Sequence, residues 1–192
     1  LVHKLAGTTP SNVPDKGAAY IGTAVHAALA EALVKHGDGW ATEVPILIPR
    51  YNIPGNVDAW HAEDGLVLDW KVVGDTALRR AKLAPSPQYR TQVHLYGLGI
   101  ERTVPDALVR TVAIAYVPRS GNFNQLHLWS EPYDEGVAEA ALRRLEHLQT
   151  LAAVPGMAAV VPTADGFCHY CPYYLPAATD LTESCPGHID PA

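Results

Sequence analysis

Several features that would decide the class of this protein are missing from its sequence. None of its apolar runs approaches the roughly 20 residues of a membrane span, and no charged-then-apolar signal segment opens the chain. Internal repeats and low-complexity tracts are absent too. Positive charge is not in excess, because the formal net charge is −6. That balance argues against a protein that coats nucleic acid by charge alone, but it allows an enzyme with a local basic groove. We expect a globular protein of the cytoplasm.

Cysteine is scarce and confined to one place. Cys168, Cys171 and Cys185 all lie in the last 25 of the 192 residues. An odd number of clustered cysteines in a chain without a signal segment points to a metal or cluster site before disulfides. The first residue is Leu1 rather than Met. We therefore expect a fragment whose natural sequence begins further upstream.

The apolar pattern predicts one domain with alternating helical and extended blocks. A helix is expected over 18–36, where apolar residues recur at helical spacing before Gly37. Three short strands follow between residues 42 and 73, separated by Gly, Asn, Pro and Asp, which favours an antiparallel meander. A polar, basic connector leads to a second helix, which we expect to begin with Ser86 at the cap and Pro87 in the first turn.

The second half completes a mixed architecture. Two strands are expected within 107–118 and 124–130, joined by a turn at 119–122, and an amphipathic helix over 134–154. This order predicts an α+β (or α/β) fold with a central mixed β-sheet flanked by helices. The length fits a single domain over 1–192, with 155–192 as a tail that carries the cysteines.

The predicted strand GLVLDWKVV (65–73) carries two opposite charges. Asp69 and Lys71 share one face of it because strand side chains alternate. An ion pair at a sheet edge is the simplest explanation. Charges in a buried strand are costly unless they are paired or bind a metal. Asp58 stands eleven positions earlier, and a turn at HAEDG (61–65) would bring it beside Asp69. Two carboxylates with a lysine suit Mg²⁺ or Mn²⁺ and an activated water.

Four short motifs in order resemble one known family. GTAVH (22–26), GNVD (55–58), DWK (69–71) and QVHLY (92–96) occur in the order and approximate spacing of the RecB-like nucleases of the PD-(D/E)xK superfamily. Each motif is weak alone, but the ordered set is specific. The chain looks most similar to the single-domain exonucleases of phages and CRISPR adaptation systems. The resemblance implies a restriction-endonuclease-like core and a divalent-metal-dependent hydrolase of single-stranded or end-bearing DNA in recombination, replication or repair.

The resemblance also implies roles for individual residues. His26, Asp58, Asp69 and the backbone carbonyl of Trp70 would be metal ligands, and Lys71 would position the attacking water. Gln92 and Tyr96, one helical turn apart, would hold the DNA strand or the lysine. The basic residues between these motifs would meet the DNA backbone: Arg79, Arg80, Lys82 and Arg90. Taken alone, Gln92 and Tyr96 are more often an ordinary pair on a helix surface. The basic residues are as compatible with a solvated loop as with DNA binding.

Two interpretations of the cysteine tail include a bound cofactor. Many RecB-like nucleases hold a [4Fe–4S] cluster with one cysteine ahead of the first catalytic helix and three near the C-terminus, which Cys168, Cys171 and Cys185 match. Residues 1–25 contain no cysteine, so the fourth ligand is expected upstream of Leu1. Alternatively, these three with His188 form a C-x₂-C-x₁₃-C-x₂-H pattern suited to structural Zn²⁺. Unliganded cysteines are the third possibility.

Two other functions remain open at this level. One is a catalytically silent nuclease-fold module that binds DNA or serves as a scaffold in a recombination or CRISPR-adaptation complex. The other is a metal-dependent phosphoesterase that acts on small phosphodiesters. The complete set of His26, Asp58, Asp69 and Lys71 favours catalysis, because a binding module has no physical need for all four.

Overall fold

The structure is a computed structural model that describes residues 2–5, 7–10, 12, 17–37, 39–157, 171–180, 182 and 184–187. The chain divides into two compact units, one of residues 18–141 and the other of residues 1–17 and 142–192. The first unit contains the sheet and is the part that positions the candidate site.

A five-stranded sheet forms the centre of the first unit. Its strands are β1 (Trp40–Ile48), β2 (Ile53–His61), β3 (Leu66–Val73), β4 (Thr111–Pro118) and β5 (His127–Pro132), and they are hydrogen-bonded in that order. Only β3 and β4 run parallel. The parallel pair needs a crossover, which the helices between residues 75 and 103 supply. The predicted α+β class with a mixed central sheet, consistent with a restriction-endonuclease-like core, is confirmed.

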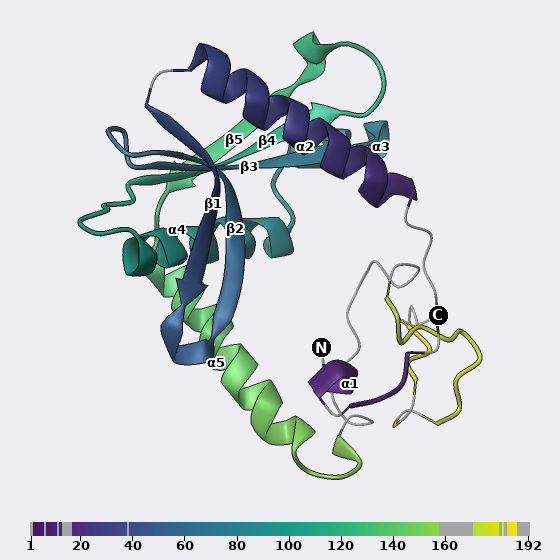
Figure 1. The fold of residues 1–192 in the computed structure, drawn as a ribbon. Helices are drawn as coiled ribbons and strands as arrows, with labels where there is room; N and C mark the ends of the chain where they lie inside the picture. Colours follow the sequence, from purple (N-terminus) through teal and green to yellow (C-terminus); the bar gives the residue numbers. More distant parts are fainter. Residues whose placement is uncertain are drawn as a thin grey trace. The chain divides into compact units, whose positions relative to one another are not determined.

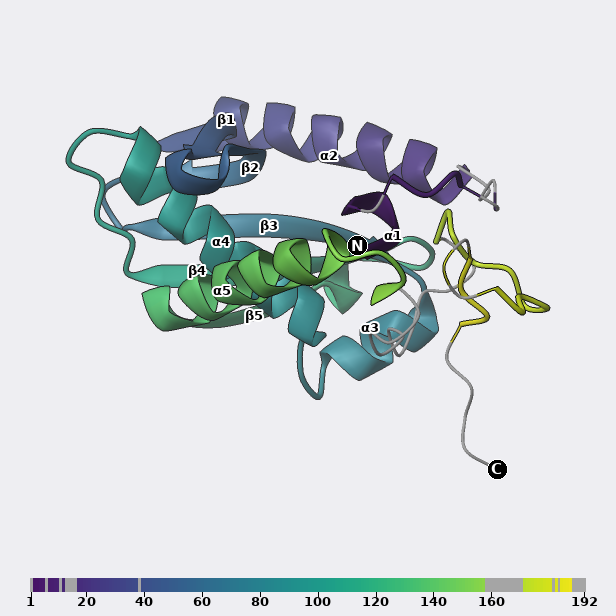
Figure 2. The same cartoon turned by 90° about the horizontal axis from the view of Figure 1, so that it is seen from below.

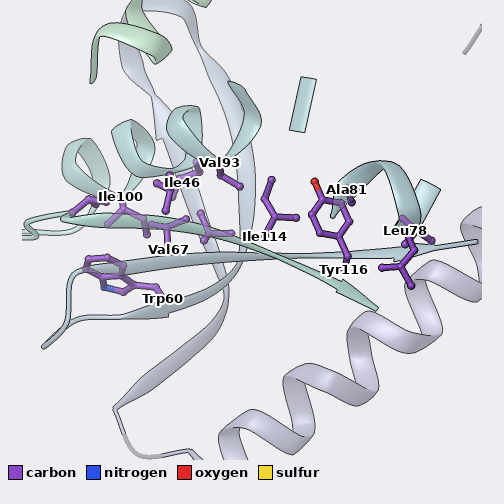
Figure 3. Close-up of a cluster of buried hydrophobic side chains, with 13 residues drawn as sticks. Ile46, Trp60, Val67, Leu78, Ala81, Val93, Ile100, Ile114 and Tyr116 are labelled. Atoms are coloured by element: carbon purple, nitrogen blue, oxygen red, sulfur yellow. The ribbon is translucent and has the colours of Figure 1, made fainter. Parts of the chain in front are cut away.

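Two helices cover opposite faces of this sheet (Figures 1 and 2). Helix α2 (Gly17–His36) brings Leu29 and Leu33 against Leu68 and Trp70 of β3. Helix α4 (Pro87–Thr103) contributes Val93 and Ile100 to the larger cluster on the other face, part of which Figure 3 shows. As expected, Leu68 and Trp70 lie on one face of β3 and Val67 and Val73 on the other. The two faces of β3 are therefore both buried, which explains its nearly continuous apolar sequence.

Local sequence signals account for several element ends. The Ser86 hydroxyl accepts a hydrogen bond from the backbone N–H of Tyr89, so α4 begins at the predicted cap. The turn between β2 and β3 contains Gly65 at φ +63°, and a β-carbon there would lie 2.4 Å from the carbonyl oxygen of Leu108. Both the backbone conformation and the close approach require glycine at this position.

One helix was not expected. The basic connector contains α3 (Asp75–Ala81), whose Leu78 and Ala81 are buried in the cluster of Tyr116 (Figure 3). Seven residues with two buried apolar positions are too few to show a helical period. The helix is fixed by this packing rather than by its own sequence pattern.

The second unit holds the two ends of the chain. Helix α1 (Val2–Leu5) lies in it, and helix α5 (Glu135–Ala152) begins in the sheet unit and ends here. The tail that follows includes a bridge between Tyr174 and Cys185. Two short 3₁₀ turns, Pro49–Tyr51 and Phe123–Gln125, belong to the sheet unit and complete the elements. Within the described ranges, no helix combines the length and the apolar character needed to cross a membrane.

Candidate active site

Regular strand pairing is interrupted at Asp58. Strands β1 and β2 pair at Thr42 with Ala59 and at Val44 with Val57, but the intervening pair, Glu43 with Asp58, is skipped. The ladder between β2 and β3 likewise ends at Ala59 with Leu68, one step before Asp58. The Asp58 carboxylate replaces the missing ladder contact, because its Oδ2 accepts a hydrogen bond of 2.8 Å from the backbone N–H of Trp70. The side chain of Asp58 is thus fixed between β2 and β3.

His26 reaches the same carboxylate from α2. Its Nδ1 lies 3.4 Å from Asp58 Oδ1, so Asp58 contacts Trp70 with one oxygen and His26 with the other. The hydrogen bond to Asp58 raises the pKa of His26, although partial burial acts in the opposite direction. The first and second motifs therefore meet through a direct contact.

Asp69 and Lys71 form a close pair on β3. Asp69 is only 1% exposed. Lys71 Nζ donates a 2.9 Å hydrogen bond to Asp69 Oδ1 and lies 2.7 Å from Oδ2. It also stands 4.9 Å from the centre of the Tyr89 ring. Burial raises the pKa of Asp69 to about 6 despite the lysine, and the nearby charge of Asp58 adds to the shift. Loss of solvation is the larger of these two causes, and the repulsion between the two acids is the smaller one.

Gln92 and Tyr96 lie close to these acids. Gln92 Nε2 donates a 2.7 Å hydrogen bond to the Tyr96 hydroxyl. The pKa of Tyr96 is raised to about 12, first by burial and then by the charges of Asp69, Asp58 and Glu43. The structure thus brings the fourth motif to the carboxylates, where its half-buried tyrosine hydroxyl borders the site.

Glu43 is a candidate that the sequence analysis missed. It occupies the position opposite Asp58 in the β1–β2 register and has φ +51°, an uncommon value for a residue other than glycine. Its carboxylate accepts a hydrogen bond from the Asn56 side chain. Three acids therefore stand at one level of three neighbouring strands. If the turn between Ile48 and Ile53 is placed first, counting residues back along β1 and forward along β2 puts Glu43 opposite Asp58.

The basic residues have more varied surroundings. Arg79 and Arg80 are exposed on α3, and Arg79 Nη2 donates to Thr76 Oγ1 at 3.3 Å. Arg90 Nε donates to Glu131 Oε1 at 2.6 Å, and the same oxygen lies 2.6 Å from Nε2 of the fully buried His94. Arg90 is 42% exposed, so part of its guanidinium remains accessible. It has a structural role in joining α4 to β5, whatever else it binds.

The carboxylate oxygens of Asp58 and Asp69 and the imidazole of His26 are of the chemical type that binds a divalent cation. Two carboxylates and an imidazole lie near one another, and a positive ion there would offset the burial and the repulsion by Asp58 that raise the pKa of Asp69. In the part of the chain that the structure describes, however, no three His, Cys, Asp or Glu side chains converge closely enough to hold a metal ion. Asp69 is instead paired with Lys71.

The cysteine tail is described only in part. Cys168 and His188 lie outside the described residues. Cys171 and Cys185 are not joined to each other by a disulfide, and Cys185 Sγ accepts a hydrogen bond of 3.4 Å from the backbone N–H of Gly187. The N-terminal segment lies against this tail, because Asn12 donates to the carbonyl oxygens of Pro172 and Cys171 at 2.8 and 3.0 Å. The chain ends are therefore paired beside two of the three cysteines.

Comparisons with known proteins give similarities among solved structures only. No family model and no curated protein matches the chain. Among solved structures it is similar to SSO0001, with a TM-score of 0.52 and 20% identity over 82% of this chain and 68% of that one. It is also similar to an alkaline exonuclease from Laribacter hongkongensis, with a TM-score of 0.49 and 12% identity over 78% of this chain and 72% of that one. At 20% identity, the likeness to SSO0001 shows the fold alone.

The dual contact of Asp58 generates a first prediction. Asp58→Ala leaves the buried N–H of Trp70 without its acceptor, so the free energy of unfolding should fall by about 1–3 kcal/mol. Asp58→Asn keeps an acceptor oxygen and should stay within about 1 kcal/mol of the parent. Urea unfolding of both variants measures the difference. Equal stability of the two variants would show that the hydrogen bond to Trp70 does not hold the strands.

The burial of Asp69 generates a second prediction. A carboxyl whose pKa rises on folding, from 3.8 to about 6 here, stabilises the fold most at low pH and loses that contribution as the pH rises through about 6. In EDTA, the free energy of unfolding of the parent should therefore fall between pH 4 and 6, by on the order of 3 kcal/mol from this group. Asp69→Asn should lack that part of the slope. Urea unfolding at several pH values measures this dependence. An identical change of the free energy of unfolding with pH in the parent and in Asp69→Asn would contradict the raised pKa of Asp69.

Proposed function

We propose that this protein is a divalent-metal-dependent deoxyribonuclease, an exonuclease that hydrolyses phosphodiester bonds of single-stranded or end-bearing DNA. The observation that carries the proposal is that two contacting pairs, His26 with Asp58 and Asp69 with Lys71, lie where the pairing of β2 with β3 stops. An edge ion pair would not account for it. Asp69 is almost fully buried, and a second acid and a histidine border the same place.

The proposed chemistry assigns a task to each side chain. A bound Mg²⁺ or Mn²⁺ would supply Lewis acidity and an acidified water. Asp58 and Asp69 would hold this ion with His26 and the carbonyl oxygen of Trp70. Lys71 would then exchange its contact with Asp69 for the attacking water and for the charge that grows on the scissile phosphate. The attacking oxygen would form a bond to phosphorus as the bond to the leaving oxygen breaks.

The surroundings of the site suit a nucleic-acid strand. Tyr96, hydrogen-bonded to Gln92, would contact the strand next to the acids. Arg79, Arg80 and the accessible part of Arg90 would bind phosphates further along. Such a local basic surface is needed because the chain as a whole carries a net charge of −6. Its role would lie in recombination, replication or repair, in a bacterial cell or a phage-infected host, with protein partners from a recombination or CRISPR-adaptation complex.

The tail would bind a structural cofactor within a single nuclease domain over 1–192. We favour a [4Fe–4S] cluster on Cys168, Cys171 and Cys185, which needs a fourth ligand, over Zn²⁺ on the same three and His188. Contacts of Thr8 and Asn12 with the tail support this choice, because they bring an N-terminal part of the chain beside Cys171. The hydrogen bond from Gly187 to the Cys185 sulfur is also of the kind that tunes metal-bound thiolates.

Catalysis should depend on the two charges of β3. Asp69→Ala should abolish the degradation of linear DNA with Mn²⁺ or Mg²⁺, and Lys71→Ala should slow it by about 10²–10³-fold. Glu31→Gln and Lys35→Ala change like groups on the exposed surface of α2 and should cleave as the parent does. Parent-like rates for Asp69→Ala and Lys71→Ala would overturn the proposal. Binding of DNA without cleavage in any divalent metal would favour the silent module instead.

The cofactor of the tail can be read from the purified protein. Anaerobically prepared full-length protein should contain iron and show a broad visible absorption band, both lost when Cys171 and Cys185 are changed to Ser. Exposed Ser→Ala variants elsewhere, such as Ser130→Ala, should keep both. Colourless protein with stoichiometric zinc would replace the cluster with the Cys₃His site.

A further inference from the structure

A cavity of about 310 Å³ lies outside the candidate active site, at the carboxyl ends of the two parallel strands. It is lined by α3 and by the connection between β4 and β5, and the lining residues that carry the argument are Asp75, Arg79, Lys82, Ser120, Gly121 and Gln125. The crevice beyond the carboxyl ends of parallel strands is where ligands of such sheets commonly bind.

The walls of this cavity are held by hydrogen bonds across it. The Ser120 hydroxyl donates to Asp75 Oδ1 at 3.3 Å, which joins the β4–β5 connection to α3. The N–H of Arg119 donates to the carbonyl oxygen of Val73 at 2.8 Å, which fixes the same connection to the end of β3. Leu78 anchors α3 in the core beneath. The cavity therefore exists without a ligand.

Its charge favours an anion. Arg79 and Lys82 contribute two positive groups, against the single carboxylate of Asp75, which accepts from Ser120. Arg79 also donates to Thr76, a contact of 3.3 Å that leaves its other N–H groups for a ligand. A guanidinium and an ammonium group are usual donors to a phosphate oxygen.

An exposed aromatic residue belongs to the same β4–β5 connection that lines this basic cavity. Phe123 lies between the lining residues Gly121 and Gln125 in sequence, and its side chain is 71% exposed. It is one of only two phenylalanines in the chain. Basic grooves combined with exposed aromatic rings are typical of single-stranded nucleic-acid sites, where phosphates meet cations and unpaired bases stack on rings. A duplex offers no free base face to such a ring.

We propose that the cavity and Phe123 bind a single-stranded segment of the DNA beyond the scissile bond, with a phosphate in the cavity and a base on the ring. The proposal rests on the proposed function for the identity of the strand. From Asp69 to Val73 is four residues, about 13 Å along a strand. At the 3.4 Å rise of stacked nucleotides, this reach corresponds to roughly four nucleotides. The site would hold the strand in register while the bond at Asp69 is cut.

The test measures binding without cleavage. In EDTA, the full chain is titrated into a fluorescent oligo(dT) 20-mer at several salt concentrations, and anisotropy gives the affinity. Arg79→Ala/Lys82→Ala should weaken binding and reduce the slope of log affinity against log salt by about 0.7, the value for one phosphate on a single strand. Arg143→Ala/Arg144→Ala, which removes two exposed arginines from α5, should change neither.

Two further variants separate this site from damage to the fold. Asp75→Asn keeps an acceptor for Ser120 but removes the opposing charge, so it should bind the 20-mer more tightly than the parent. Phe123→Ala should weaken binding about five-fold or more, and Phe123→Trp should restore it. Phe123→Ala should leave the affinity for a blunt 20-bp duplex unchanged.

The outcomes distinguish this proposal from the nuclease assignment. Parent-like affinity and salt slope for Arg79→Ala/Lys82→Ala would overturn the phosphate site, even if the protein cleaves DNA. An equal effect of Phe123→Ala on duplex and single strand would overturn the stacking role. If the parent cleaves no DNA in any metal but the variants change binding as expected, the strand site stands and the nuclease function fails.

Discussion

The hydrogen bond from the Trp70 N–H to the Asp58 carboxylate is the contact on which the candidate site depends. Backbone groups in a sheet need partners, and regular pairing of β2 with β3 ends one residue before this point. By supplying the missing acceptor, Asp58 lets β2 leave the ladder without an unsatisfied N–H. The same side chain is thereby held against His26 and near Asp69. One carboxylate joins two strands and a helix.

Burying the charge of Asp69 in the sheet costs free energy, which its pairing with Lys71 partly offsets. Asp69 is buried, which raises its pKa to about 6, yet Lys71 lies within hydrogen-bonding distance and stands over the ring of Tyr89. A buried ion pair of this kind contributes little net stability, so stability alone does not account for it. It keeps two reactive groups fixed on a rigid strand. A loop could not hold them as closely, because loops carry fewer packing contacts.

Much of the fold was predictable because the strands carry strong patterns and the helix starts carry specific residues. The meander of β1–β3 and the cap at Ser86 followed from sequence, as did the faces of β3. Helix α3 did not, since Leu78 and Ala81 become informative only when Tyr116 lies beside them. Glu43 was missed for a related reason. Its place opposite Asp58 depends on how β1 and β2 are paired. In the local sequence, Glu43 looks like any exposed residue of a strand.

The central claim is that Asp58 and Asp69 form one cation site with His26. Calorimetric titration of Mn²⁺ into the full chain, compared with an Asp58→Asn/Asp69→Asn variant that retains the acceptor for Trp70, measures it most directly. The account predicts saturable Mn²⁺ binding by the parent that the double variant loses while remaining folded. Binding of equal affinity and stoichiometry in the double variant would contradict it.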